Sequence, residues 1–496
     1  MRKSILLFLF LTGCAVGPDY KTPDTVVSDA WTSDEQANNC EPIQTWWKTF
    51  QDDLLNQYIE KAAACNYNIQ TAEANILQAR ALRQIAASSF FPQAGLDVNA
   101  TKTYFSKNGP VFTIGQSTGN SADTSSPVTG LPFALQTPQL QNLFNFLFDA
   151  SWELDVFGKI RRTVEAAEAQ IESAIAHRND ILISVFAEVA KNYIDLRSFQ
   201  RRAELLQKNI DLLTKHAEIT KISLEKGYAN QLDLEEIEAQ LAAAKAALPT
   251  VYSEIYRSIY TLSVLIGQPP ETLVDDLLVT RPLPTPPANI AVGLRSDLLR
   301  RRPDIRYAER QLAEATAAVG IAVANFFPTV SLLANGGFQS LALPSLFNWG
   351  SRTWAYGADV NVPIFEGGQQ VGTLRFTQAS QSAAAAKYQQ TVLSALQDAE
   401  GSLKNYQELA ISTKKYDESV LHTNFVVVLT RERHLKGLVN LINLLTNEQQ
   451  LVSTELTQLD SKTAELTALI SLYKALGGGW ECVTEEKKDD SEVSKR

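Results

Sequence analysis

The stretch Phe-Asn-Phe-Leu-Phe-Asp-Ala-Ser-Trp-Glu-Leu-Asp-Val at residues 144–156 decides the fold, because two kinds of pattern meet at its end. Large apolar side chains alternate with polar ones along it, which is typical of a β-strand with one apolar and one polar face. Directly afterwards, residues 159–226 contain no proline or glycine, so one long helix is expected there. The sequence therefore predicts an α+β protein in which strands lead into very long helices.

Three further segments alternate in the same way, and they fix the number of strands at four. The predicted strands cover about 93–105, 143–156, 329–339 and 354–364. Strands of about 10–13 residues are long enough to cross a membrane, but a transmembrane barrel needs at least about eight of them. Open strand edges in hydrocarbon would leave backbone groups unpaired, at several kcal/mol each. If these strands face lipid, several copies of the chain must share one barrel.

The rest of the chain is predicted to be mainly helical. Helical stretches are expected over 53–90, over 297–326 with Pro303 as a helix-start proline, and over 369–433. Apolar residues spaced three and four apart follow the long helices and continue in the return helices, which indicates coiled-coil packing. Pro249 lies within the first return helix and is expected to bend it.

Matching helix-end and turn motifs in the two halves of the chain indicate an internal repeat. Phe-Phe-Pro occurs at 90–92 and at 326–328, and Gly-x-x-Asn occurs at 227–230 and at 437–440. We divide the mature chain into a first repeat at 51–280, a Pro-rich linker at 281–294 and a second repeat at 295–480. The charged tail at 481–496 is expected to be disordered.

The first residues predict export and lipid attachment. Arg2 and Lys3 precede an apolar run at 5–11, which is far too short to span a bilayer and fits a signal peptide over 1–13. The Leu-x-Gly-Cys sequence that ends at Cys14 is similar to a bacterial lipobox, so residues 14–50 are predicted to form a lipidated N-terminal extension. The alternative is an ordinary signal peptide with an incidental cysteine.

Composition argues against several classes of function. The net charge of −10 disfavours nucleic acid as a partner. Cys40, Cys65 and Cys482 lack metal-ligand spacing, and the sequence does not say whether any two of them pair. His177, His216 and His422 are isolated along the chain and form no ligand cluster. No phosphate loop, nucleophile elbow or catalytic triad spacing occurs, so we expect a non-enzyme without metal or cofactor, apart from the lipid.

Several motifs, in order along the chain, resemble the TolC family of outer membrane efflux channels, in its lipoprotein (NodT-like) branch. They are Trp-Trp at 46–47, Ser-Trp-Glu-Leu-Asp-Val-Phe-Gly at 151–158, Leu-Ile-Gly-Gln-Pro at 265–269 and Leu-Leu-Arg-Arg-Arg-Pro-Asp-Ile at 298–305. The resemblance implies a homotrimer with one 12-stranded transmembrane barrel, a periplasmic α-helical tunnel and a mixed equatorial belt. It also implies a chain anchored in the outer membrane lipid, which works with a periplasmic adaptor protein and an inner-membrane transporter.

The same resemblance places a gate at the periplasmic helix tips. It implies an apolar constriction at Ile442, a polar ring at Asn443 and Thr446 where relatives usually carry carboxylates, and a retained Asp233. His434 lies where some relatives place an aromatic gate residue, so a pH-dependent contact between His434 and Asp233 is a further hypothesis. The alternatives are that these residues only cap helix turns and that His434 is simply solvated.

Two other functions remain open from the sequence. A channel of this kind also suits protein secretion, although the lipoprotein-type N-terminus favours the efflux of small molecules such as drugs and toxic compounds. A periplasmic lipoprotein that acts as a coiled-coil spacer without a pore would have no use for the four aromatic strands. Substrate, pump partners and gating trigger are not encoded in any motif that we can identify.

Overall fold

The computed structural model describes residues 15–23, 31, 44–106, 139–287 and 295–481. The chain forms two compact units. Among the described residues, the first, here called the strand unit, consists of 15–20, 81–106, 139–167 and 315–380. The second, the helical unit, consists of 21–23, 31, 44–80, 168–287, 295–314 and 381–481. The predicted signal peptide, Cys14 and nearly all of the charged tail lie outside the described residues, as do Cys40 and Cys482, whereas Cys65 is exposed and unpaired.

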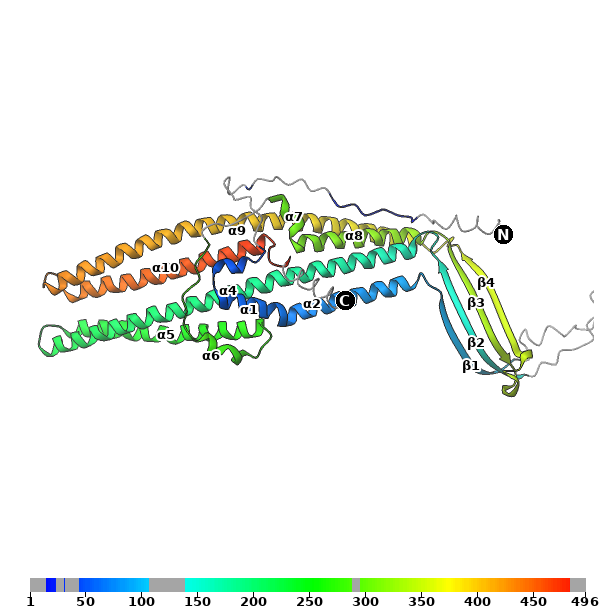
Figure 1. Cartoon of the computed structure of the whole chain (residues 1–496), viewed down its shortest axis with the longest axis horizontal. Helices are drawn as coiled ribbons and strands as arrows, with labels where there is room; N and C mark the ends of the chain where they lie inside the picture. Colours follow the sequence, from blue (N-terminus) through cyan, green and yellow to red (C-terminus); the bar gives the residue numbers. More distant parts are fainter. Residues whose placement is uncertain (1–14, 24–30, 32–43, 107–138, 288–294, 482–496) are drawn as a thin grey trace, which may run out of the picture. The chain divides into compact units, whose positions relative to one another are not determined.

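The strand unit contains one antiparallel sheet with the order β1-β2-β3-β4 (Figure 1). The strands are β1 (Gln93–Tyr104), β2 (Leu140–Leu154), β3 (Thr329–Ser340) and β4 (Arg352–Asn361). β2 begins before the predicted start at 143, and β4 ends before the predicted end at 364. The early end of β4 has a physical reason, because Pro363 lacks the backbone N–H that a strand ladder needs.

The register of the sheet separates apolar from polar side chains. Leu96 pairs with Phe148, which pairs with Gly336, which in turn pairs with Trp354, so these residues share one face. On the other face Asn145 donates to Asn99 at 2.9 Å, and Gln339 donates to Asn145 at 2.9 Å. The alternation in the sequence therefore becomes an apolar face and a polar face that each extend over several strands.

Two of the predicted helical stretches, 53–90 and 297–326, are each divided into two helices. The stretch at 53–90 forms α1 (Asp53–Cys65) and α2 (Tyr67–Ser88), with the break at Asn66. The Asn66 side chain accepts hydrogen bonds from Asn68 N at 2.8 Å and from Ile69 N at 3.3 Å, which starts a new helix. In the second half α7 (Leu298–Arg301) is followed by α8 (Pro303–Ala324), and α8 begins at its proline.

Four long helices form two hairpins (Figure 1). α4 (Lys159–Glu225) returns as α5 (Gln231–Leu265), and α9 (Gln369–Leu435) returns as α10 (Leu441–Ala475). α4 and α9 both have 67 residues, and α5 and α10 both have 35, which agrees with an internal repeat. α5 runs through Pro249, and its expected bend there stays a prediction. The remaining elements are α6 (Val274–Leu277) and short 3₁₀ helices at Trp46–Phe50, Pro270–Leu273, Arg295–Asp297, Leu343–Ser345 and Trp349–Ser351.

The core of the helical unit is built around the two tryptophans of the N-terminal Trp-Trp motif. Trp46 is 1% exposed and stacks on Tyr473 of α10 with ring centroids 5.3 Å apart. Trp47 packs edge-on against Phe186 of α4 at 5.1 Å. The N-terminal segment therefore joins helices of both repeats in one apolar cluster. Within the described part of the chain, no helix is both long and apolar enough to cross a membrane.

Candidate functional site

The turn between α9 and α10 carries most of the predicted gate residues, and its geometry follows from local sequence. Gly437 has a φ of +70°, a left-handed conformation that glycine adopts without strain, and it ends α9. Asn440 then caps α10, because its side-chain oxygen accepts a hydrogen bond from Asn443 N at 3.0 Å. The tip is thus a tight, well-defined turn in the helical unit.

Ile442, Asn443 and Thr446 lie exposed on one face of the first turns of α10. Ile442 is 46% exposed, and the Thr446 hydroxyl donates to the Ile442 carbonyl oxygen at 2.9 Å. Leu444 and Leu445 of the same turns are buried. In a single chain this exposed face has the access that is needed to line an opening or to meet another copy.

Asp233 lies at the equivalent turn of the first hairpin, where it takes part in a capping box. Asp233 N donates to the Asn230 side chain at 2.8 Å, and Asn230 N donates to the Asp233 carboxylate at 3.2 Å. This arrangement uses Asp233 to start α5. It agrees with the alternative in which a predicted gate residue caps a helix.

His434 hydrogen-bonds within its own turn. Its Nδ1 lies 2.9 Å from the Val439 carbonyl oxygen. Among the described residues of a single chain, His434 and Asp233 form no hydrogen bond. The hypothesis of a contact between His434 and Asp233 has therefore gained no support, and it stays a prediction for an assembled form.

Sequence reasoning missed a buried ionic cluster close to the same tip. His216 of α4 lies with its Nε2 2.8 Å from Glu448 Oε2 of α10, and Arg431 Nη2 of α9 donates to Glu448 Oε1 at 2.6 Å. Glu448 is only 5% exposed. His216, which looked isolated along the sequence, thus helps to join three helices from both repeats. The available signal was a carboxylate four residues after Leu444, on the buried face of α10.

The electrostatics of this cluster favour an ionised Glu448. Burial alone would raise the pKa of its carboxyl, but the hydrogen bonds and charges of His216 and Arg431 outweigh burial and lower that pKa. A buried carboxylate with two such partners is stabilised where an unpaired one would be expensive. The cluster therefore links the two hairpins near their tips through buried hydrogen bonds and ion pairs.

The described residues offer little for chemistry. They contain no group of three or more His, Cys, Asp or Glu side chains that could hold a metal ion. A cavity of about 740 Å³ lies between the Pro-rich stretch 280–286 and helices α4, α9 and α10, and it is lined by charges of both signs, among them Arg201, Lys414 and Glu455. Nothing in this lining pairs a nucleophile with a base.

Comparisons with known proteins agree on one family. The sequence pattern of the outer membrane efflux protein family matches residues 58–268 and 294–478. The toluene efflux pump outer membrane protein TtgF of Pseudomonas putida is 27% identical over 97% of this chain and 98% of its own length. Nodulation protein T of Rhizobium leguminosarum bv. trifolii is 26% identical over 95% of this chain and 96% of its own. The solved structure of the outer-membrane channel OprN is 31% identical, with a TM-score of 0.82 over 94% of this chain and 100% of that one.

Proposed function

Because the chain belongs to the outer membrane efflux protein family, we propose that it is the outer membrane exit duct of a tripartite efflux pump. In this proposal three copies share one 12-stranded barrel in the outer membrane. Their long helices form a periplasmic tunnel through which small molecules, such as drugs and toxic compounds, leave passively. A periplasmic adaptor protein and an inner-membrane transporter supply the cargo and the energy.

The two-faced, open sheet is the observation that carries this proposal. Its strands are 12, 15, 12 and 10 residues long, which suits strands that cross a bilayer. Val98, Phe148 and Tyr356 are more than half exposed on the apolar face, while the ladder of Asn99, Asn145 and Gln339 lies on the polar face. Lipid outside and water inside a barrel would suit these two faces.

The edges of the sheet support the sharing of the barrel between copies. Among the described strands, β1 and β4 each have a neighbour on one side only. An unpaired edge within hydrocarbon would cost several kcal/mol for each free backbone group. Pairing β4 of one copy with β1 of the next removes both edges, and three copies supply twelve strands.

In the helical unit, the proposed gate consists of an apolar ring of Ile442 and a polar ring of Asn443 and Thr446. An apolar ring closes a pore by excluding water and needs no charge. In this proposal Asp233 and His434 lie near the gate, and the lipid on Cys14 adds a membrane anchor. An amide and a hydroxyl would bind cations more weakly than the carboxylates usual in relatives.

Conductance of the purified protein in planar bilayers tests both the duct and the gate. We expect small, infrequent openings for the unaltered chain and larger, more frequent ones for Ile442→Ala. Comparing His434→Ala with the unaltered chain from about pH 5 to 8 tests the histidine hypothesis. Identical pH profiles would remove His434 from the gate, and the absence of any conductance in both Ile442→Ala and the unaltered chain would contradict the duct.

A further inference from the structure

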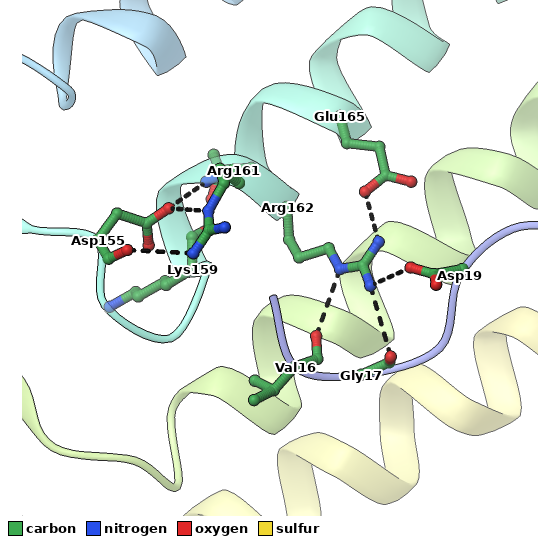
Figure 2. A network of polar contacts seen from close by, with 9 residues as sticks. Val16, Gly17, Asp19, Asp155, Lys159, Arg161, Arg162 and Glu165 are labelled. Carbon is green, nitrogen blue, oxygen red and sulfur yellow. Dashed lines mark hydrogen bonds and ion pairs between the residues drawn. The ribbon is translucent and has the colours of Figure 1, made fainter. Parts of the chain in front are cut away.

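The residues that directly follow Cys14 are docked against the start of α4 in the strand unit (Figure 2). Val16 N donates to the Phe157 carbonyl oxygen at 3.2 Å. In return Arg162 Nε donates to Val16 O at 3.3 Å, and Arg162 Nη2 donates to Gly17 O at 3.4 Å. The backbone of residues 15–19, here called the strap, is therefore held from both sides.

Arg162 is built to receive this strap. Its side chain is only 5% exposed, although it carries a full positive charge. Nη2 contacts Asp19 Oδ1 of the strap at 2.6 Å, and Nη1 contacts Glu165 Oε2 of α4 at 2.7 Å. Without the strap, Arg162 would retain only Glu165 of these four partners. Because a buried guanidinium is stable only when its donors are satisfied, the strap completes a site that α4 alone leaves incomplete.

Three glycines give the strap a close fit as well as a charge partner. A Cβ on Gly17, which has a φ of +95°, would lie 2.6 Å from the Cα of Gly320 in α8. A Cβ on Gly158, which has a φ of +84°, would lie 2.7 Å from the Cα of Ala15. A Cβ on Gly320 itself would lie 2.9 Å from Arg162 Cδ. The strap thus touches α8 of the second repeat and the start of α4 of the first, with no room for side chains between them.

We propose that Arg162 is the positioning residue of a rigid mount, which docks the strap at the junction between β2 and α4 and so fixes the place where the N-terminal lipid leaves the protein. This inference rests on the lipid attachment at Cys14 within the proposed function. Ala15 is docked beside Gly158 at this junction. Because neighbouring Cα atoms are about 3.8 Å apart, a lipid carried by the preceding residue would be tethered one such step from a fixed point. If the five residues of the strap were undocked, the lipid could lie up to about 17 Å from the point where the chain is next held.

Tryptic cleavage after Lys21 measures whether the strap is docked, because a protease needs an undocked stretch of chain on both sides of the bond. The experiment uses the full-length protein in detergent and follows release of the N-terminal peptide by mass spectrometry. Asp19→Asn is the central variant, since the Asp19 side chain is 82% exposed and its loss leaves the core untouched. Glu165→Gln is the matched control, because it also removes one carboxylate from Arg162 but none from the strap.

We expect Asp19→Asn to release the peptide about two- to fivefold faster, as fits the loss of a largely exposed ion pair. Arg162→Ala removes all three of the arginine's contacts to the strap and should accelerate release more than about tenfold. Arg162→Lys keeps the charge without the planar fork, so its rate should lie between. Glu165→Gln should match the unaltered chain. Equal release rates for Asp19→Asn, Arg162→Ala and the unaltered chain would overturn the docking.

Growing the cells that produce the protein with radioactive palmitate labels any attached lipid. This labelling separates the mount from the lipid attachment on which it rests. With both correct, the label leaves the full-length band together with the N-terminal peptide, and faster in Asp19→Asn than in Glu165→Gln. Absence of label from the unaltered chain would overturn lipid attachment and with it the mount, whatever the cleavage rates show. Label that stays on the large fragment after cleavage would place the lipid elsewhere and would also overturn the mount.

Discussion

Replacing Glu448 by glutamine should weaken the buried polar contacts that link the two helical hairpins. Glu448 accepts hydrogen bonds from His216 and Arg431, on helices α4 and α9. Glutamine keeps the size of the side chain but removes its charge, and its amide presents a donor where the carboxylate had an acceptor. The change therefore isolates the ionic contribution from packing.

The surroundings of the two partners set the size of the effect. Breaking a buried ion pair costs about 3–5 kcal/mol when a charge is left buried without a partner. The Arg431 side chain, however, is 55% exposed and regains water, whereas His216 stays buried with its Nδ1 already lacking a hydrogen bond among the described atoms. We therefore expect a loss of about 2–3 kcal/mol, closer to that of hydrogen bonds to charged groups.

Hydrogen exchange measured by mass spectrometry reports this loss where it occurs. A local free energy of opening that falls by about 2–3 kcal/mol should speed exchange in the first half of α10 by about 30- to 150-fold. Glu455→Gln is the control, since Glu455 lies seven residues further along α10 and the structure gives it no ion pair with another described residue. Equal exchange in Glu448→Gln and Glu455→Gln would refute the reasoning.

Three further predictions concern the sheet, the core and the response to acid. Gly337→Ala should push β3 away from β2, because its Cβ would lie 2.0 Å from Phe146 O, and the yield of trimer in detergent should fall; Gly336→Ala, with nothing nearer than 3.9 Å, should assemble normally. The Trp46 ring is only 1% exposed, so Trp46→Ala should lower the free energy of unfolding by about 3–5 kcal/mol and lower the thermal midpoint measured by circular dichroism. An unchanged midpoint would show that the ring contributes nothing to the core. The fold lowers the pKa of Glu448, so the ionised carboxylate stabilises the folded state above about pH 4.3, and this stabilisation is lost as the pH falls through the folded pKa. Acid should therefore lower the thermal midpoint less in Glu448→Gln than in the unaltered chain. An identical acid response in both proteins would contradict that assignment.

Much of the fold follows from local patterns that act over a few residues. Alternation around Phe148 identifies strands because the two faces of a sheet see different surroundings. The absence of proline and glycine after Lys159 allows a helix of 67 residues. The break at Asn66 was harder to find, since helical composition continues on both sides of it. There a side chain caps a new helix, and its amide also donates to Leu265 O at 2.7 Å, a partner distant in sequence.

The candidate site was predictable only where it depends on turns. Gly437 and Asn440 mark the tip directly, because a left-handed residue followed by a cap has a local signature. The contact between His216 and Glu448 joins positions 232 residues apart, and no local pattern relates them. The same holds for Arg162 and the strap, where three glycines and one arginine meet only after both repeats have folded.

The mass of the detergent-solubilised mature protein, corrected for bound detergent, tests the central claim most directly. The open sheet with its exposed apolar face leads us to expect about three times the mass of one chain, since only shared strands remove the edges at β1 and β4. A monomer that remains stable in buffer without detergent would contradict the account. It would leave the four strands without a membrane role and would favour a periplasmic spacer instead.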